Sequence, residues 1–177
     1  MELPQTLTSI IDGMMSFLAQ TAADPIAYSI VLFFYAIMAA VILPIPVEVG
    51  LLLSPHTPVI MLAAILGLGK MVGSVLVFYL GLGIGDKVEG WSAKWPGFGW
   101  LVAKSEWLVK KLNYLGLYLI LSVPLMTDTV PLYIFSILNK NGVFTMQMFA
   151  FANLCAGITR ASILLILLSL FGVDLIN

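Results

Sequence analysis

Four charged residues lie in stretches of the chain that are otherwise apolar: Glu48, Lys70, Asp128 and Arg160. A charge at the centre of a bilayer costs roughly 2.5–3.5 kcal/mol on insertion scales, so it normally faces an opposite charge or a wet cavity. Transporters place their substrate and coupling-ion sites at this depth. We therefore predict that the two carboxylates and the two cations form one polar site, which binds a substrate or an ion.

Both carboxylates lie beside prolines, in segments where an apolar run is interrupted. A proline inside a helix removes a hydrogen bond and breaks or kinks the helix. At membrane depth, broken backbone survives only where it is buried in protein or lines a water-filled cavity. Glu48 and Asp128 are therefore expected where a helix stops and its backbone groups are freed. The residues that support the site at these two breaks are Pro44, Pro46, Thr127, Thr129 and Pro131.

The sequence leaves a purely structural alternative open. Glu48 and Asp128 each precede a short apolar leg, where a carboxylate can accept free backbone N–H groups at the positive end of a helix. In that case, two buried ion pairs with Lys70 and Arg160 would only specify the fold.

The composition places the whole chain in a bilayer. Of its 177 residues, 61% are hydrophobic and only 10% are charged, whereas soluble domains average roughly a quarter charged residues. The net charge of −1 excludes a nucleic-acid-binding protein, which would show a basic patch. Cys155 is the only cysteine, so neither a disulfide nor a cysteine metal site is expected. Because no HExxH, GxSxG or Walker A motif is present, we expect no enzyme and no cofactor.

The apolar runs predict an all-α, polytopic integral membrane protein. Residues 1–20 show the periodicity of an amphipathic helix that lies in the membrane interface. The runs 58–85 and 145–172 are long enough to span a bilayer, which takes about 20 apolar residues. The runs 26–43 and 112–126 are shorter and end at the two breaks, which suits legs of re-entrant hairpins.

The same order of elements occurs twice along the chain. Residues 1–85 and 86–177 each contain a surface helix, an apolar leg, a Pro-broken acidic segment, a short leg and one long span. In each half a proline stands four residues before the carboxylate: Pro44 before Glu48, and Pro124 before Asp128. We predict a single membrane domain over residues 1–177 that is built from two repeats, each with one re-entrant hairpin.

The lysines predict how the two halves are oriented. If each hairpin enters and leaves on one face, the single span between the hairpins makes them enter from opposite faces. This topology puts six lysines on the face of the 86–111 segment and none on the other face. Since lysine-rich loops stay in the cytoplasm, we predict inverted repeats in a multi-pass protein of the cell membrane, with 86–111 cytoplasmic. The same segment holds all four tryptophans, which is typical of a membrane–water interface.

Small residues recur at multiples of four positions on both long spans. This spacing lets two helix backbones approach closely, so it predicts helix packing rather than chemistry. The residues are Gly69, Gly73, Gly81 and Gly85 on the first span, and Asn153, Gly157 and Ala161 on the second.

Several of these segments resemble the DedA family, also called VTT or SNARE-associated Golgi protein-like. PIPVE at 44–48 is similar to its first re-entrant motif, and the glycine-rich run 69–85, with Tyr79, resembles its long span. NLCAGITR at 153–160, which begins with Asn153, resembles its late Asn–Gly segment. The resemblance implies lipid movement across bilayers, including that of polyprenyl-phosphate carriers. Family members carry arginines around the second re-entrant segment, where residues 122–136 have none.

These observations predict a flippase or scramblase that moves a lipid, such as a phospholipid or a polyprenyl phosphate, across the bilayer. The expected partners are membrane lipids and a lipid or small amphiphilic substrate, with proton coupling and homo-oligomer formation left open. Two alternatives remain: a proton-coupled exporter of small solutes, and a non-transporting membrane scaffold whose charges lock the fold. We expect neither a metal nor a nucleic acid as a ligand.

Overall fold

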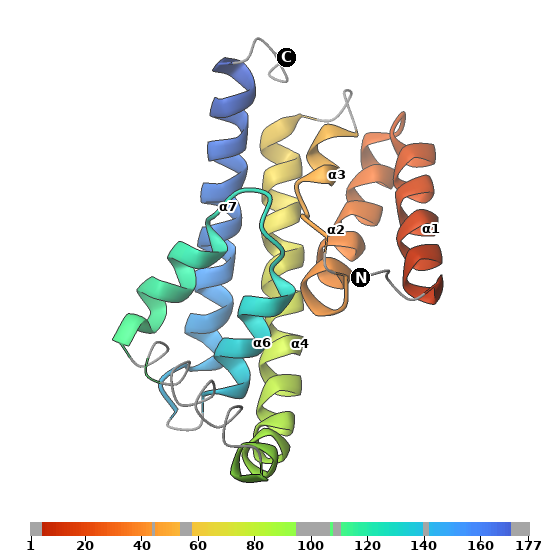
Figure 1. The fold of residues 1–177 in the computed structure, drawn as a ribbon. Coiled ribbons are helices and arrows are strands. Elements are labelled where there is room, and N and C mark those ends of the chain that lie inside the picture. The colour runs from red at the N-terminus through yellow and green to blue at the C-terminus, as the bar shows by residue number, and fades with distance from the viewer. Residues whose placement is uncertain are drawn as a thin grey trace.

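The computed structural model describes residues 5–43, 45–53, 58–94, 107, 111–139 and 142–170, and every regular element in these ranges is an α-helix (Figure 1). In chain order the helices are α1 (Gln5–Thr21), α2 (Pro25–Val41), α3 (Val49–Leu52), α4 (Val59–Lys94), α6 (Thr129–Ile137) and α7 (Met146–Leu170). Residues 111–121 are helical as well. The prediction of an all-α fold is therefore confirmed for the described part of the chain.

Two antiparallel helices form the centre of the bundle. Segments Ile60–Ile84 of α4 and Met146–Leu167 of α7 are long and apolar enough to cross a membrane, and the two helices pack against each other (Figure 1). They coincide with the two long apolar runs of the sequence. α4 also continues past residue 85 to Lys94. The sequence changes there from apolar to charged residues, but such a change does not by itself end a helix.

Two helical hairpins flank this central pair. In the first, α2 leads to a bend that includes residues 42–43 and 45–48, and α3 returns toward the end at which α2 began (Figure 1). In the second, a bend at residues 122–128 joins the 111–121 helix to α6. Figure 1 shows the first hairpin opening toward the C-terminal end of α7 and the second opening toward the opposite end. The two bends consequently face each other in the middle of the bundle.

Local chemistry explains where α2 begins. Asp24 is its N-cap, and one carboxylate oxygen accepts hydrogen bonds from the backbone N–H of Ile26 at 2.9 Å and of Ala27 at 3.2 Å. Pro25 occupies the first turn, where its missing N–H costs nothing. The carboxylate thus satisfies backbone donors that have no partner within the helix.

Glycines let α2 and α4 approach closely. A Cβ atom at Gly69 would lie 2.6 Å from Cβ of Ala36, and one at Gly73 would lie 2.7 Å from Cβ of Ala40. Gly81 makes the same kind of contact with α6. The predicted helix packing is confirmed at these three glycines. The contacts at Gly69 and Gly73 set the position of the neighbouring Lys70 along the bundle axis relative to α2.

α1 is the helix for which the sequence predicts a position in the membrane interface. It runs alongside α2 (Figure 1), with Leu18 fully buried and Met14 and Met15 packed against the same core. Periodicity identifies the apolar face of a helix, but it does not reveal what covers that face. Here α2 covers part of it, and Phe17 remains exposed.

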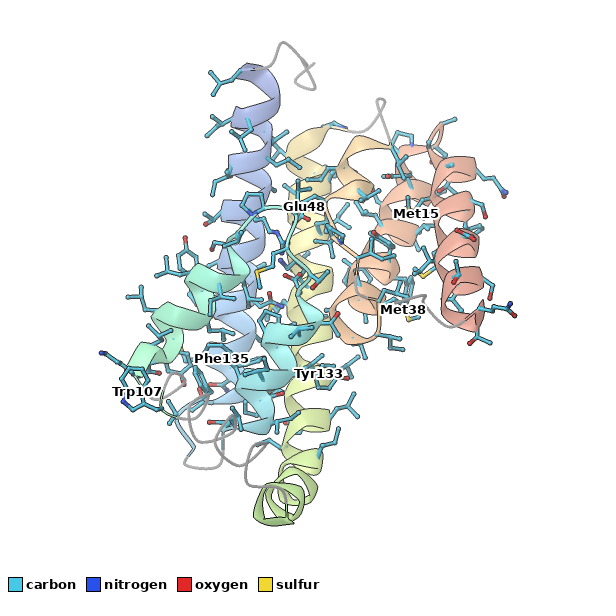
Figure 2. All side chains as sticks on the ribbon, viewed as in Figure 1. Met15, Met38, Glu48, Trp107, Tyr133 and Phe135 are labelled. Atoms are coloured by element: carbon cyan, nitrogen blue, oxygen red, sulfur yellow. The ribbon has the colours of Figure 1, made fainter. Side chains whose placement is uncertain are left out.

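Some sequence predictions fall outside the described residues. They concern Pro44 and most of the 95–110 segment. Within that segment Trp107 is exposed, and Nζ of Lys111 lies 4.8 Å from the centre of its ring. Figure 2 shows Trp107 at the edge of the bundle and Glu48 in its interior. This contact between a cation and an aromatic ring fits the lysine- and tryptophan-rich character of the segment.

Candidate functional site

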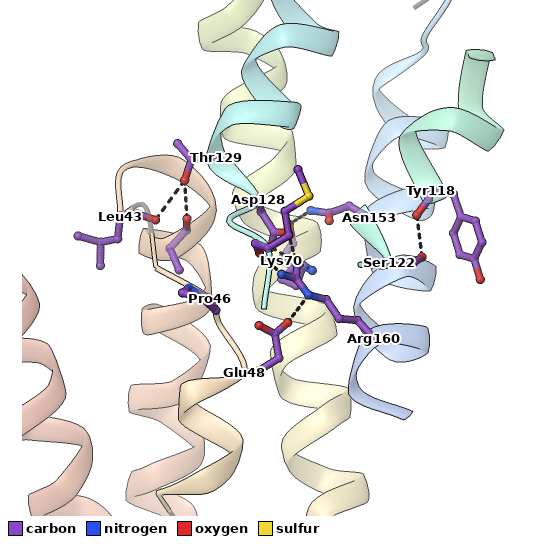
Figure 3. Close-up of polar contacts among 12 residues, drawn as sticks. Leu43, Pro46, Glu48, Lys70, Tyr118, Ser122, Asp128, Thr129, Asn153 and Arg160 are labelled. Atoms are coloured by element: carbon purple, nitrogen blue, oxygen red, sulfur yellow. Dashed lines mark hydrogen bonds and ion pairs between the residues drawn. The ribbon is translucent and has the colours of Figure 1, made fainter. Parts of the chain in front are cut away.

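The four charged residues that the sequence singles out form one buried cluster (Figure 3). Each is at most 2% exposed. Nε of Arg160 lies 2.5 Å from Oε1 of Glu48, and its Nη1 lies 2.5 Å from Oδ1 of Asp128. Nζ of Lys70 lies 3.0 Å from Oδ2 of Asp128. The structure therefore brings together all four predicted binding residues.

Each residue of the cluster comes from a different element. Lys70 lies in the membrane-length part of α4 and Arg160 in that of α7, while Glu48 and Asp128 belong to the bends of the two hairpins. Each cation pairs with the carboxylate of the other half of the chain, Lys70 with Asp128 and Arg160 with Glu48. The ion pairs thus connect the two halves.

Arg160 joins the two bends directly. In addition to its contacts with Glu48 and Asp128, its Nη2 donates a hydrogen bond to the backbone carbonyl of Met126. Guanidinium presents five donors in a rigid fork, so one side chain can serve several acceptors at fixed angles. Met126 was not identified from the sequence, since a backbone acceptor leaves no signal in residue type.

The capping alternative is wrong for both carboxylates. Glu48 and Asp128 do occupy the N-cap positions of α3 and α6, yet neither side chain makes a capping hydrogen bond. Both side chains contact the cations of the cluster instead. A full positive charge at ion-pair distance attracts a carboxylate more strongly than the partial charge of a helix end does.

The two carboxylates are held differently. Asp128 uses one oxygen for Lys70 and the other for Arg160, whereas Oε2 of Glu48 is buried and has no hydrogen-bond partner among the described residues. Oδ1 of Asn153 is likewise buried and unpartnered. A buried polar atom without a partner costs about 1–3 kcal/mol. Oδ2 of Asp128 also lacks a hydrogen bond, but it lies 3.0 Å from Nζ of Lys70. The oxygens of Glu48 and Asn153 are therefore the places at which a proton, a water molecule or a polar ligand would be bound most favourably.

Thr129 ties the second bend to the first hairpin (Figure 3). Its hydroxyl lies 2.9 Å from the backbone carbonyl oxygen of Ala39 and 3.1 Å from that of Leu43. Ala39 lies in the last turn of α2 and Leu43 directly follows its C-cap, Ile42, where backbone carbonyls lack helical partners. Among the other predicted supporting residues, Pro131 is buried in α6 and Thr127 is half-buried.

Asn153 and Gly157 of α7 shape the space around Lys70. Nδ2 of Asn153 donates a hydrogen bond to the backbone carbonyl of Lys70 at 2.8 Å. A Cβ atom at Gly157 would lie 3.3 Å from Cδ of Lys70. Since Arg160 follows on the same helix, this face of α7 accommodates the stem of Lys70 and contributes the second cation of the cluster.

Tyr79 does not belong to the site. Its side chain is 59% exposed, and its ring packs edge-on against that of Phe78 with 6.0 Å between the centroids. It lies about two and a half helical turns after Lys70, so it points away from the cluster on the opposite side of α4. The described contact of its ring is therefore with Phe78 and not with the four charged residues.

Two buried tyrosines next to the site were missed in the sequence. Tyr28 donates a hydrogen bond from its hydroxyl to the carbonyl of Gly50, and Tyr35 donates one to the carbonyl of Pro46. Their spacing of two helical turns on α2 was the available signal, since it places them on one face. An apolar run hides such residues because a tyrosine ring is itself largely apolar.

The described residues contain no group of three His, Cys, Asp or Glu side chains that could hold a metal ion. The cluster instead offers two carboxylates and two cations, which can exchange their partners with a charged or polar ligand. The fold and the site together define an all-helical bundle with two helices of membrane-spanning length around one buried four-charge cluster. Comparisons of the chain with protein-family models, with curated proteins and with solved structures find no match.

Proposed function

We propose that this chain is a polytopic membrane protein of DedA type. In this proposal α4 and α7 cross the bilayer, and the two hairpins enter it from opposite faces as inverted, re-entrant repeats. Two helices of sufficient length and apolarity, the opposite orientation of the hairpins (Figure 1) and the bends in mid-bundle support it. Broken backbone at that depth needs protein or water around it, and here the four-charge cluster lies beside both bends.

The proposed activity is movement of a lipid or small amphiphile across the bilayer. The observation that carries it is the bridge from Arg160 to both hairpin bends. If the bends separate, the guanidinium of Arg160 becomes available to a polar headgroup. The headgroup then takes the place of Glu48 or Asp128 as its partner. A site between two inverted repeats that open alternately is the arrangement used by many transporters. Phospholipids and polyprenyl phosphates are the proposed substrates, and Glu48 is the proposed acceptor of a coupled proton.

The proposed topology places the 86–111 segment in the cytoplasm and the protein in the cell membrane. Six lysines on one face and none on the other support this orientation. The proposed partners are membrane lipids, and a homo-oligomer is compatible with the exposed apolar faces of α4 and α7.

One observation favours a second candidate function, that of a non-transporting scaffold. The two carboxylates and two cations neutralise one another, as they would if their role were only to specify how the helices pack. Buried ion pairs have such a role in some proteins. Oε2 of Glu48, to which no described residue donates a hydrogen bond, supports transport, because this oxygen can take up a proton or a polar ligand.

Reconstitution into liposomes tests the proposal. Vesicles that contain the full chain and a fluorescent phospholipid are treated with a membrane-impermeant quencher, with and without an imposed proton gradient. Transport predicts that the protein increases the fraction of quenched lipid beyond the half expected from the outer leaflet. Release of a trapped small solute without lipid movement would identify a solute exporter. If neither lipid nor solute moves, the scaffold function is favoured.

A further inference from the structure

Two tyrosine hydroxyls hold the backbone on either side of Glu48. Tyr28 and Tyr35 are both fully buried and lie two turns apart on one face of α2. The hydroxyl of Tyr28 donates to the carbonyl of Gly50 at 2.5 Å, and that of Tyr35 donates to the carbonyl of Pro46 at 3.2 Å. Glu48 stands midway between these two carbonyls in the sequence. Its backbone is therefore attached to α2 on both sides.

This segment has little regular structure of its own. The backbone hydrogen bonds around Glu48 join residues three apart: Val49 to Pro46 at 3.4 Å, Gly50 to Val47 at 3.2 Å and Leu51 to Glu48 at 2.8 Å. Such bonds form single turns with poorer geometry than α-helical bonds. α3, with four residues, is too short to hold the bend in place by itself.

The bend lies directly on α2. Gly50 has no side chain, and a Cβ atom there would collide with the side chain of Leu32, which lies between the two tyrosines on α2. This close approach brings the carbonyl of Gly50 within reach of Tyr28. The tyrosines, Leu32 and Gly50 thus form one packed surface that sets the position of the bend.

The position of Glu48 matters because it is the one member of the cluster contributed by the first hairpin. Among the described residues, its only ion pair is with Arg160, at 2.5 Å, whereas Asp128 is held by two cations. A small displacement of the bend would therefore break the contact of Glu48 and leave that of Asp128 intact.

We infer that Tyr28 and Tyr35 are positioning residues that hold Glu48 against Arg160. They act on the carboxylate through the backbone carbonyls of Gly50 and Pro46, and they do not contact a substrate themselves. The inference concerns the site described above, and only its transport readout rests on the proposed function.

The variants Tyr28→Phe and Tyr35→Phe, alone and together, remove the hydroxyls and keep the buried rings. Tyr79→Phe is the matched control, since this exposed tyrosine of α4 lies away from the cluster. The full chain in liposomes is treated with dicyclohexylcarbodiimide, an apolar reagent for buried carboxyls, and modification of Glu48 and of Asp128 is followed separately by mass spectrometry. Modification of Asp128 serves as an internal control for general loosening of the fold.

We expect each single tyrosine variant to raise the modification rate of Glu48 about fivefold, the factor that corresponds to about 1 kcal/mol for one hydrogen bond. The rate at Asp128 should stay at the wild-type value. Equal rates at Glu48 in the variants and in Tyr79→Phe would overturn the inference, and so would an equal rise at both carboxylates. If the double variant fails to fold, the single variants still decide between these outcomes.

Lipid movement is measured on the same vesicles as a second readout. Tyr35→Phe should slow it, because the displaced carboxylate no longer meets Arg160, and Tyr79→Phe should leave it at the wild-type rate. In a protein that moves lipid, equal rates in Tyr35→Phe and Tyr79→Phe would overturn the positioning role. If the wild-type protein moves no lipid but Glu48 becomes more reactive in the tyrosine variants, the proposed function fails and the positioning role is supported.

Discussion

Arg160 on α7 contacts Glu48 in the bend of the first hairpin, with 2.5 Å between Nε and Oε1. The same guanidinium also holds Asp128 and the carbonyl of Met126 in the second bend. One side chain therefore connects two segments that lie far apart in the sequence and enter the bundle from opposite ends. Its removal should affect both hairpins at once.

Arg160→Met should destabilise the protein by about 3–5 kcal/mol, because among the described residues it leaves the buried carboxylates with Lys70 as their only cation. Thermal unfolding in detergent measures the effect, with Asp12→Asn at an exposed position of α1 as the control. Adding Glu48→Gln to Arg160→Met should recover part of the loss, since it removes one uncompensated charge. A stability of Arg160→Met equal to that of the control would contradict the bridging role.

The two carboxylates should differ in their importance for stability. Asp128→Asn places a neutral amide against both Lys70 and Arg160 and should cost about 3–5 kcal/mol. Glu48→Gln keeps an oxygen that can accept from Arg160 and leaves Asp128 in place, so about 1–3 kcal/mol is expected. Unfolding midpoints of the two variants are compared with that of Asp12→Asn, an exposed carboxylate on α1. The reverse order of stability would show that the pairing of the cluster is different.

Glycines on one helix should tolerate alanine very unequally. At Gly69 a Cβ atom would lie 2.6 Å from Cβ of Ala36 and 2.7 Å from the carbonyl oxygen of Phe33, whereas at Gly83 nothing lies within 4 Å. Gly69→Ala should therefore cost about 1–3 kcal/mol through overpacking, and Gly83→Ala should be neutral or slightly stabilising. Melting temperatures in detergent check the pair. Equal effects would mean that α2 and α4 do not pack through Gly69.

The proposed topology predicts opposite accessibility at the two ends of the bundle. Cysteines introduced at Ala23, in the turn between α1 and α2, and at Ser92, near the end of α4, should react with an impermeant maleimide from opposite sides of the membrane. Cys155 is replaced by alanine beforehand so that only the introduced thiol reacts. Labelling of both positions from the same side would rule out the inverted arrangement.

Much of the cluster was predictable from the sequence. Lys70 and Arg160 in mid-span, together with Glu48 and Asp128 at proline breaks, are each too costly to bury alone, so their meeting follows from a simple energetic argument. Which cation meets which carboxylate was not predictable, because it depends on the reach of each side chain after the helices have packed.

Other features of the structure left a weak signal or none. The roles of Tyr28 and Tyr35 depend on backbone carbonyls, whose partners are not encoded in residue type. The exposed position of Tyr79 was not predictable, because a place in a glycine-rich run does not specify which side of the helix faces the charged residues. The packing of α1 against α2 was also hidden, since an amphipathic pattern shows an apolar face and not its neighbour.

The most direct test of the central claim, that the buried charges are a transport site, is lipid movement by Glu48→Gln in liposomes. The substitution keeps the size of the side chain and removes its charge and its ability to exchange a proton. We expect the variant to insert and remain folded, as judged by gel filtration and thermal unfolding, and to lose lipid movement or its response to a proton gradient. Asp12→Asn should move lipid at the wild-type rate. Full lipid movement by Glu48→Gln at every pH, with an unchanged response to the gradient, would contradict the claim and leave the cluster a structural role only.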